Sequence, residues 1–102
     1  MRHDVYAHPS PRWRALYPFV VQLQADTIEG PERIAAPLIH ARRVVALHAR
    51  EVPIVRIDGE EYGILVRAMR PLPNRALRRP VGSAAAWRDE IALAIDLLFF
   101  GF

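Results

Sequence analysis

The spacing of apolar residues predicts a helix over the last twenty residues, 83–102. Ser83 can cap its start, because a serine hydroxyl accepts a hydrogen bond from an unpaired N–H of the first turn. Two apolar stripes follow at helical spacing. The first contains Trp87, Ile91, Ala94, Ile95, Leu98 and Phe102, and the second contains Leu93, Leu97 and Phe100. One core cannot cover both stripes, so we expect one face to pack on the protein's own sheet and the other to meet a second chain.

Alternation of apolar and polar residues predicts three strands, over 2–7, 19–25 and 34–38. Gln22 lies on the polar side of the second strand and should face solvent. Pro37 lacks an N–H group, which should restrict the third strand to an edge or a bulge. The residues expected to face the core in the first two strands are Val5, Ala7, Phe19, Val21, Leu23 and Ala25.

A β-hairpin is predicted over 54–68, with strands 54–57 and 62–68. Asp58-Gly59 is a favoured two-residue turn because both positions require a positive φ angle. Residues 40–50 fit a helical turn as well as a short strand. After residue 68, three prolines (Pro71, Pro73 and Pro80) should interrupt regular structure until the final helix.

The order of elements predicts one domain over residues 1–102, mainly β in an α+β arrangement: a small antiparallel barrel with a C-terminal helix. The chain has no cysteine, so disulfides and thiolate metal sites are excluded. No apolar run has the length of a transmembrane helix, and residues 1–4 lack the apolar region of a signal peptide. We therefore expect a cytoplasmic protein without a membrane span.

All fourteen basic residues are arginine, and the formal net charge is +3. The segment 67–79 contains five arginines and no acidic residue. Nucleic-acid binding is one interpretation of this segment, and a solvated loop that meets an acidic partner is another. Trp13, between Arg12 and Arg14, could stack on a base or a partner, or could cover the edge of the barrel.

No arrangement of residues in the sequence indicates catalysis. The four histidines are scattered without metal-ligand spacing and fit surface positions; they are His3, His8, His40 and His48. The carboxylates of Asp58, Glu60 and Glu61 belong to the predicted hairpin turn and should be solvated. We therefore predict a protein that is not an enzyme and that uses no cofactor or metal.

Five collinear stretches resemble the CcdB family, toxins of plasmid toxin–antitoxin modules. They are Val5-Tyr6, Phe19 to Ile28, Arg33 to Leu38, Ile54 to Tyr62, and Ala94 to Phe102. The resemblance covers nearly the whole chain. It implies a small SH3-like antiparallel β-barrel with a C-terminal α-helix, of CcdB/MazF type, that forms a twofold homodimer through apolar sheet and helix surfaces.

The resemblance also implies a function. Such a toxin binds the A subunit of DNA gyrase and traps its cleaved-DNA complex, and a CcdA-like antitoxin neutralises it with a flexible, mainly acidic segment. Toxin and antitoxin together repress their operon, so DNA is contacted only indirectly, through the toxin–antitoxin complex. Charge complementarity suggests the basic residues that would hold the antitoxin: Arg42, Arg43, Arg75, Arg78 and Arg79.

Carried over position by position, the resemblance implies gyrase contacts by Thr27, Ile28, Asp96, Phe99, Phe100, Gly101 and Phe102. The family typically ends in Trp-Gly-Ile, where this chain has Phe-Gly-Phe. Phenylalanine keeps an aromatic plate but loses the indole N–H donor. Asp96 replaces a family asparagine and adds a negative charge. Either change could weaken gyrase poisoning or retune it to another gyrase.

Two alternatives stay open. An endoribonuclease toxin is one, because MazF-like ribonucleases share the barrel and a fold does not determine a function. RNA cleavage would need an acid–base pair and an arginine in one cleft, and His48 with Arg50 or Arg67 could be proposed. The other alternative is an inactive module that only binds the antitoxin.

Overall fold

The computed structural model describes residues 1–44 and 50–101. Seven strands make up one sheet: β1 (Asp4–Ala7), β2 (Phe19–Gln22), β3 (Glu32–His40), β4 (Ile54–Ile57), β5 (Glu60–Ile64), β6 (Arg70–Pro73) and β7 (Gly82–Ser83). The α-helix α1 spans Arg88–Phe100. Short 3-10 helices lie between these elements: η1 (Ala41–Arg43), η3 (Val66–Ala68), η4 (Asn74–Ala76) and η5 (Ala85–Trp87).

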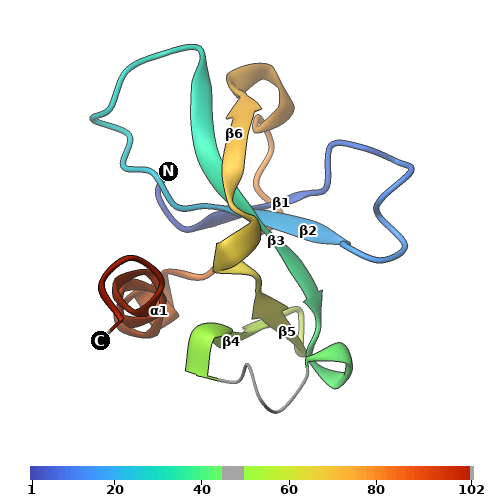
Figure 1. Ribbon diagram of the computed structural model, residues 1–102. Coiled ribbons are helices and arrows are strands. Elements are labelled where there is room, and N and C mark those ends of the chain that lie inside the picture. Colours follow the sequence, from blue (N-terminus) through green and yellow to red (C-terminus); the bar gives the residue numbers. More distant parts are fainter. Residues whose placement is uncertain (45–49, 102) are drawn as a thin grey trace.

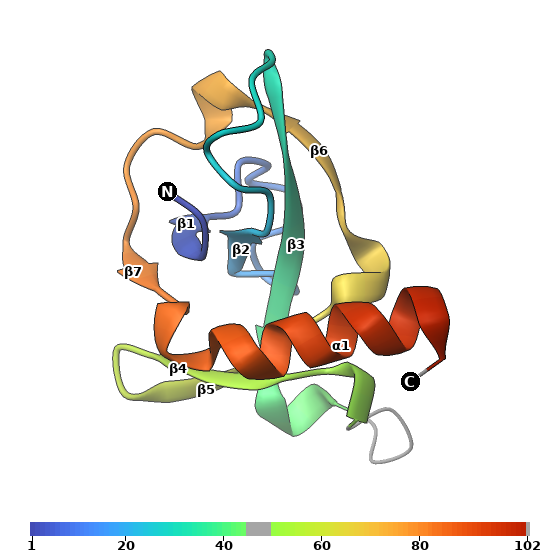
Figure 2. The same cartoon turned by 90° about the vertical axis from the view of Figure 1, so that its left-hand side faces the viewer.

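The sheet is organised around β3, the longest strand (Figure 1). All pairings are antiparallel, and the strand order is β4-β5-β3-β2-β1-β7, with β6 also paired to β3. The strongly curved sheet makes a nearly closed small barrel, and α1 lies across it (Figure 2). This confirms the predicted fold class, a mainly β protein with a C-terminal helix.

The prediction that Pro37 limits its strand to an edge was wrong, because β3 is central. One side of β3 pairs with β2 along residues 35–38. On the other side, β6 pairs with residues 32–35 and β5 with residues 38–40. Pro37 lies between these two pairings, and its carbonyl accepts a hydrogen bond from the N–H of Leu65. The missing N–H therefore falls where the partner strand changes, and no ladder hydrogen bond is lost.

The central strands are buried on both faces, which simple alternation did not predict. The main core cluster contains Val5, Val21 and Ala36 and extends to α1. A second cluster on the opposite face contains the neighbouring residues of the same strands, Tyr6, Val20 and Ala35, together with Leu77, which directly follows η4. Ala7, expected to be buried, is exposed. Gln22, expected to face solvent, is fully buried.

The predicted hairpin is confirmed, with positive φ angles at Asp58 (51°) and Gly59 (82°). Its second strand ends at Ile64 instead of residue 68, because η3 begins at Val66. The strand β6 was missed, since Pro71 and Pro73 were taken as interruptions. The two prolines are two residues apart, so their nitrogens share one side of the strand, and a strand with a single partner tolerates this.

The helix begins five residues later than expected. Ser83 belongs to β7, and its hydroxyl oxygen accepts a hydrogen bond from the N–H of Ala85 at 3.1 Å, ahead of η5. In α1, Ile91 and Ala94 are buried in the core, and Trp87 and Ile95 pack against it. The predicted core-facing stripe is thereby confirmed for Trp87, Ile91, Ala94 and Ile95. It is wrong for Leu98, which is 37% exposed on the last turn of the helix, beyond the last residue that packs on the core. Phe102 lies outside the described residues. No helix in the described part of the chain is long and apolar enough to span a bilayer.

Truncating a buried isoleucine of the hairpin should destabilise the protein more than truncating an exposed one. Ile64→Ala removes a fully buried side chain of the main core and should lower the free energy of unfolding by about 2–5 kcal/mol. Ile54→Ala, on the neighbouring strand but partly exposed, is the matched control and should cost less than half as much. Urea unfolding followed by circular dichroism measures both, and equal losses would contradict the described core.

Candidate functional site

The end of α1 forms a glycine-capped platform. Gly101 has a φ angle of 77°, in the left-handed region that glycine adopts most easily. Its N–H donates a hydrogen bond to the carbonyl of Leu97 at 3.1 Å, which satisfies a carbonyl that the ending helix would leave unpaired. Gly101 directly follows Phe99 and Phe100, so the helix ends there and both phenylalanines lie on its last turn.

The outer face of this helix is apolar and exposed. Phe99, Phe100 and Leu93 are 64%, 65% and 57% exposed, and we refer to these three residues as the outer helix face. Leu98 is 37% exposed but lies one turn from Ala94, on the inner side of the helix. Asp96 is exposed and lies three or four positions from Leu93, Phe99 and Phe100, the spacing of neighbours on a helix surface. The structure therefore brings four predicted gyrase-contacting residues together, namely Asp96, Phe99, Phe100 and Gly101. Phe102, also predicted, lies outside the described residues.

Thr27 and Ile28 lie in a second exposed patch, on the loop 23–31 between β2 and β3. Ile28 is 57% exposed. Figure 2 shows this loop and α1 on the same side of the molecule, with the loop at one end of β3 and the helix across the other half of that strand. The predicted site is thus two patches that face one side and are separated along β3.

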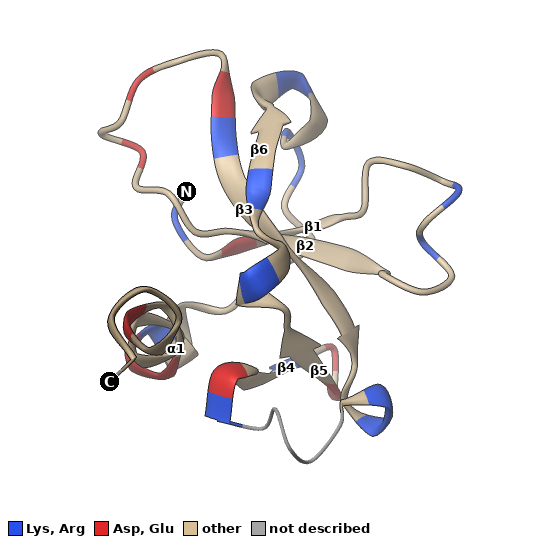
Figure 3. Cartoon of the chain, in the orientation of Figure 1, with Lys and Arg blue, Asp and Glu red and all other residues tan. Residues whose placement is uncertain are grey.

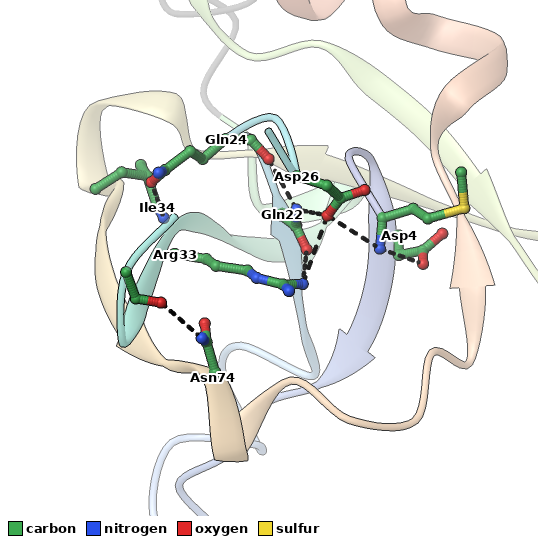
Figure 4. Close-up of polar contacts among 9 residues, drawn as sticks. Asp4, Gln22, Gln24, Asp26, Arg33, Ile34 and Asn74 are labelled. Carbon is green, nitrogen blue, oxygen red and sulfur yellow. Dashed lines mark hydrogen bonds and ion pairs between the residues drawn. The ribbon is translucent and has the colours of Figure 1, made fainter. Parts of the chain in front are cut away.

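The β2–β3 loop is held by a buried glutamine (Figure 4). The amide nitrogen of Gln22 donates hydrogen bonds to the carbonyl of Gln24 at 2.8 Å and to the carboxylate of Asp26 at 2.9 Å. Its amide oxygen accepts one from the guanidinium of Arg33 at 3.1 Å. Buried amides require such partners, since an unpaired one loses its hydration without compensation. Gln22 therefore fixes the course of the chain just before Thr27 and Ile28.

Further contacts anchor both ends of the same loop. The side-chain oxygen of Gln24 accepts a hydrogen bond from the N–H of Ile34 at 3.0 Å, and Asn74 donates one to the carbonyl of Gly30 at 2.8 Å. Asp26 also lies 3.6 Å from the guanidinium of Arg33. The hydrogen bond from Gln22, followed by the neighbouring positive charges, lowers the pKa of Asp26 below its ordinary value. Sequence patterning missed this network, because Gln22 and Gln24 resembled the solvent side of a strand.

The arginines proposed to hold an antitoxin fall into two groups (Figure 3). Arg75, Arg78 and Arg79 line one open cleft of about 660 Å³, together with Arg14 from the β1–β2 loop. We call this the arginine cleft. Arg42 and Arg43 lie on η1, at the other end of β3. The structure therefore joins three of the five candidates, adds Arg14, which sequence reasoning did not assign, and places the remaining two elsewhere.

The structure corrects the expectation of four surface histidines. His3 and His8 are buried, and His40 is half-buried against the ring of Tyr62 at 5.0 Å. Burial and nearby arginines lower the pKa of His3 and of His8. His48 lies outside the described residues. Asp58, Glu60 and Glu61 are exposed at the hairpin turn, as predicted.

The described residues contain no acid–base pair in the cleft that a ribonuclease would need. Arg67 lies 3.6 Å from Glu51, a partly exposed ion pair beside an apolar pocket of about 320 Å³. Arg50 is exposed at the edge of the described segment. Across residues 1–44 and 50–101, no three histidine or acidic side chains gather in a way that could hold a metal ion.

The described residues thus form a small, nearly closed antiparallel barrel with a C-terminal helix whose end is exposed. The sequence model of one family, described as CcdB protein, matches residues 2–101. The chain belongs to the CcdB family. Its members are toxins of toxin–antitoxin systems that act on DNA gyrase.

Replacement of the buried glutamine should release the β2–β3 loop. In Gln22→Leu, a side chain of similar size fills the space but offers no hydrogen bonds, so the pKa of Asp26 should rise and amide exchange over residues 24–31 should accelerate. Gln24→Leu is the matched control: it removes the bond to Ile34 but leaves the Gln22–Asp26 bond in place. NMR titration and hydrogen exchange measure both effects.

The direction of the pKa shift of Asp26 determines how the stability of the protein depends on pH. The folded pKa of Asp26 lies below its ordinary value of 3.8, so its stabilising contribution is fully present above that pH and is lost as the pH falls through the folded pKa. Gln22→Leu should reduce this acid-dependent loss. An unchanged Asp26 titration in Gln22→Leu would contradict the described network.

Proposed function

We propose that this protein is the toxin of a type II toxin–antitoxin system, that it binds the A subunit of DNA gyrase, and that it traps the cleaved-DNA complex. A cognate, CcdA-like antitoxin neutralises it. Membership in the CcdB family supports the general function. The observation that carries the site is the pair Phe99 and Phe100, both largely exposed on a helix end that Gly101 terminates.

Exposed aromatic rings at a rigid terminus are suited to binding. Aromatic residues are among those that dominate interface energetics, because one ring buries a large apolar area and loses little conformational entropy. The helix that carries these rings is anchored on the barrel by Ile91 and Ala94, about one to two turns before Phe99. Phe99 and Phe100 are therefore held in place before a partner arrives, which lowers the entropic cost of association.

The second patch, Thr27 and Ile28, supplies an additional contact on the same side of the molecule. It is held in place by the Gln22 network, so both patches are presented by ordered segments. Gyrase would have to span the interval along β3 between them. Inhibition by such contacts needs no titratable group, and we infer that the protein acts as a binding poison and not as an enzyme.

The outer helix face also favours a homodimer. Leu93, two turns before Phe100, extends the apolar surface away from the terminal phenylalanines and makes it larger than a single anchor requires. A twofold interface would pair like surfaces of two copies. The antitoxin, in turn, is proposed to use its acidic segment on the arginines, with Arg75, Arg78 and Arg79 in the arginine cleft as the principal contacts and Arg42 and Arg43 as separate ones.

Toxicity should depend on the helix end. Phe100→Ala removes an aromatic anchor, which costs about 2 kcal/mol or more at an interface centre, or roughly thirtyfold in affinity. Growth inhibition on induced expression should therefore be lost, and gyrase should no longer accumulate as a cleaved-DNA complex. Phe100→Trp, with a larger plate, should keep or strengthen poisoning. A melting temperature close to the parent's shows that the variants fold.

The ribonuclease alternative predicts the reverse. In His48→Gln, growth inhibition should persist if the protein poisons gyrase, and it should disappear if RNA cleavage is the activity. Parallel assays with purified gyrase and with RNA separate the two. A Phe100→Ala protein that still kills, beside a His48→Gln protein that does not, would overturn the gyrase proposal.

Sedimentation should show a dimer. At micromolar concentration the expected mass is twice the 11.6 kDa of one chain. Leu93→Glu places a charge in the outer helix face and should shift the protein toward monomer, because a charge buried at an interface without a partner is costly. Val81→Glu changes an exposed valine outside this face and is the matched control. A parent protein that sediments only as a monomer would contradict the proposal.

Antitoxin capture should depend on the arginine cleft. Simultaneous Arg75→Ala, Arg78→Ala and Arg79→Ala should slow association with an acidic antitoxin segment about tenfold at low salt, and the difference should shrink as salt screens the charges. Arg2→Ala, Arg56→Ala and Arg88→Ala together remove the same charge from exposed sites outside the cleft. Equal association rates for the two triple variants would exclude the cleft.

A further inference from the structure

The β1–β2 loop, residues 8–18, lies between two neighbouring hollows on the surface. On one side is a pocket of about 280 Å³, which we call the aromatic pocket. On the other side is the arginine cleft. Adjacent residues of this loop line different hollows: His8 and Trp13 line the pocket, while Pro9 and Arg14 line the cleft. The β1–β2 loop therefore borders both hollows.

Three rings line the aromatic pocket. The rings of His8 and Tyr17 are stacked, with centroids 6.3 Å apart and an interplanar angle of 27°. Trp13 is tilted against Tyr17 at 6.2 Å and is 43% exposed. The remaining walls come from β2, β3 and β6 and include Val20 and Leu72. Trp13 therefore packs against Tyr17 with one part of its ring and offers the rest of the indole surface to the hollow.

A polar donor completes this pocket. Nδ1 of His8 accepts a hydrogen bond from the N–H of Ser10 at 3.1 Å. Burial, reinforced by the charge of Arg70, lowers the pKa of His8, so the ring is neutral at pH 7 and carries its proton on Nε2. Among the described residues, Nε2 has no hydrogen-bond acceptor, and it remains available to one on a ligand. Arg70, which also lines the pocket, adds a positive charge.

The surface around both hollows is rich in arginine, and of the segments that line the hollows only β1 and β3 carry a carboxylate, Asp4 and Glu32, each at the start of its strand. Residues 5–25 and 62–88 contain no Asp or Glu. Figure 3 shows arginine but no acidic residue on the β1–β2 loop and along β6 and the segment after it. Within the described residues, these arginines form no ion pair: Arg12, Arg14, Arg70, Arg75, Arg78 and Arg79. Arg12 instead lies over the Trp13 ring, with its guanidinium carbon 5.6 Å from the ring centroid.

We propose that this face binds single-stranded nucleic acid, with one unstacked base in the aromatic pocket and the adjoining phosphates in the arginine cleft. Proteins that bind single strands combine aromatic stacking surfaces with a positively charged groove, and both features meet here on the two sides of one loop. The pocket is near the lower limit of small-ligand sites, a size that suits one ring system. Arg12 can exchange its exposed contact with Trp13 for a phosphate.

The shape of the pocket excludes a duplex as the preferred ligand, because paired bases are stacked and cannot enter it. An acidic peptide would satisfy the arginines and could accept the His8 proton, but its carboxylates offer no flat ring to stack on the aromatic side chains of the pocket. The proposal is independent of gyrase binding, which uses the outer helix face. It also differs from DNA contact through an antitoxin, since here the toxin itself binds the strand.

The test measures the affinity of the purified protein for a fluorescent oligothymidine of about eight nucleotides, by anisotropy at about 50 mM and about 200 mM salt. Trp13→Leu keeps an apolar side chain but loses the stacking plate, and it should weaken binding about tenfold. Trp13→Phe should retain most of the affinity. Loss of Arg75, Arg78 and Arg79 should flatten the salt dependence, because each lost phosphate contact reduces the slope by about 0.7.

Controls separate this proposal from its competitors. Phe100→Ala should bind the oligonucleotide as the parent does, so that failure of the gyrase proposal leaves this result unaffected. Equal affinity for a duplex of the same length, or for thymidine monophosphate alone, would overturn the single-strand assignment. So would undiminished binding by a folded Trp13→Leu protein. A polyglutamate peptide that binds as tightly as the oligonucleotide, with the same dependence on Trp13, would show an acidic-peptide site instead.

Discussion

The structure depends on β3 forming hydrogen bonds along both of its sides. One side serves β2, and the other serves β6 and then β5, which is possible only because Pro37 lies at the change of partner. Any other residue at position 37 would carry an N–H group at a point where neither β5 nor β6 pairs with β3. The nine residues of β3 thus connect the hairpin, the proline-rich strand and the N-terminal strands into one barrel.

The same strand sets the separation of the two candidate gyrase patches. The loop with Thr27 and Ile28 leads directly into β3, and η3, which lies against β3 further along, also contacts α1. The two patches therefore belong to a single rigid support. Their relative position depends on strand pairing and on helix packing through Ile91 and Ala94, and not on a flexible connection.

Local signals in the sequence were sufficient for some elements. The Asp58-Gly59 turn was predictable, because the two positive φ angles are a property of those two residues. Helical spacing predicted the burial of Ile91 and Ala94 in α1, but not the exposure of Leu98. Gln22 was not predictable, since its burial depends on Asp26 and Arg33, and alternation alone cannot report such partners. β6 was missed for a related reason: only its position beside β3 shows that Pro71 and Pro73 can be accommodated.

The candidate site was predicted in the same uneven way. The candidate residues at the helix end were predicted from the family resemblance alone. The structure adds that Phe99, Phe100 and Ile28 are exposed. Arg14 escaped notice because it is distant in sequence from Arg75, Arg78 and Arg79, and only folding brings the β1–β2 loop beside η4. Composition cannot predict which residues that are distant in sequence lie together on the surface.

The uneven placement of charge gives the molecule an electric dipole. The β1–β2 loop and the segment from β6 to η5 carry arginines and no acidic residue, whereas α1 carries three acidic residues, Asp89, Glu90 and Asp96, and a single arginine, Arg88 (Figure 3). In the field of a polyanion the molecule would rotate its arginine side forward and its helix end away. Long-range attraction and the helix-end contact thus favour opposite orientations, and dissolved salt changes the balance between them.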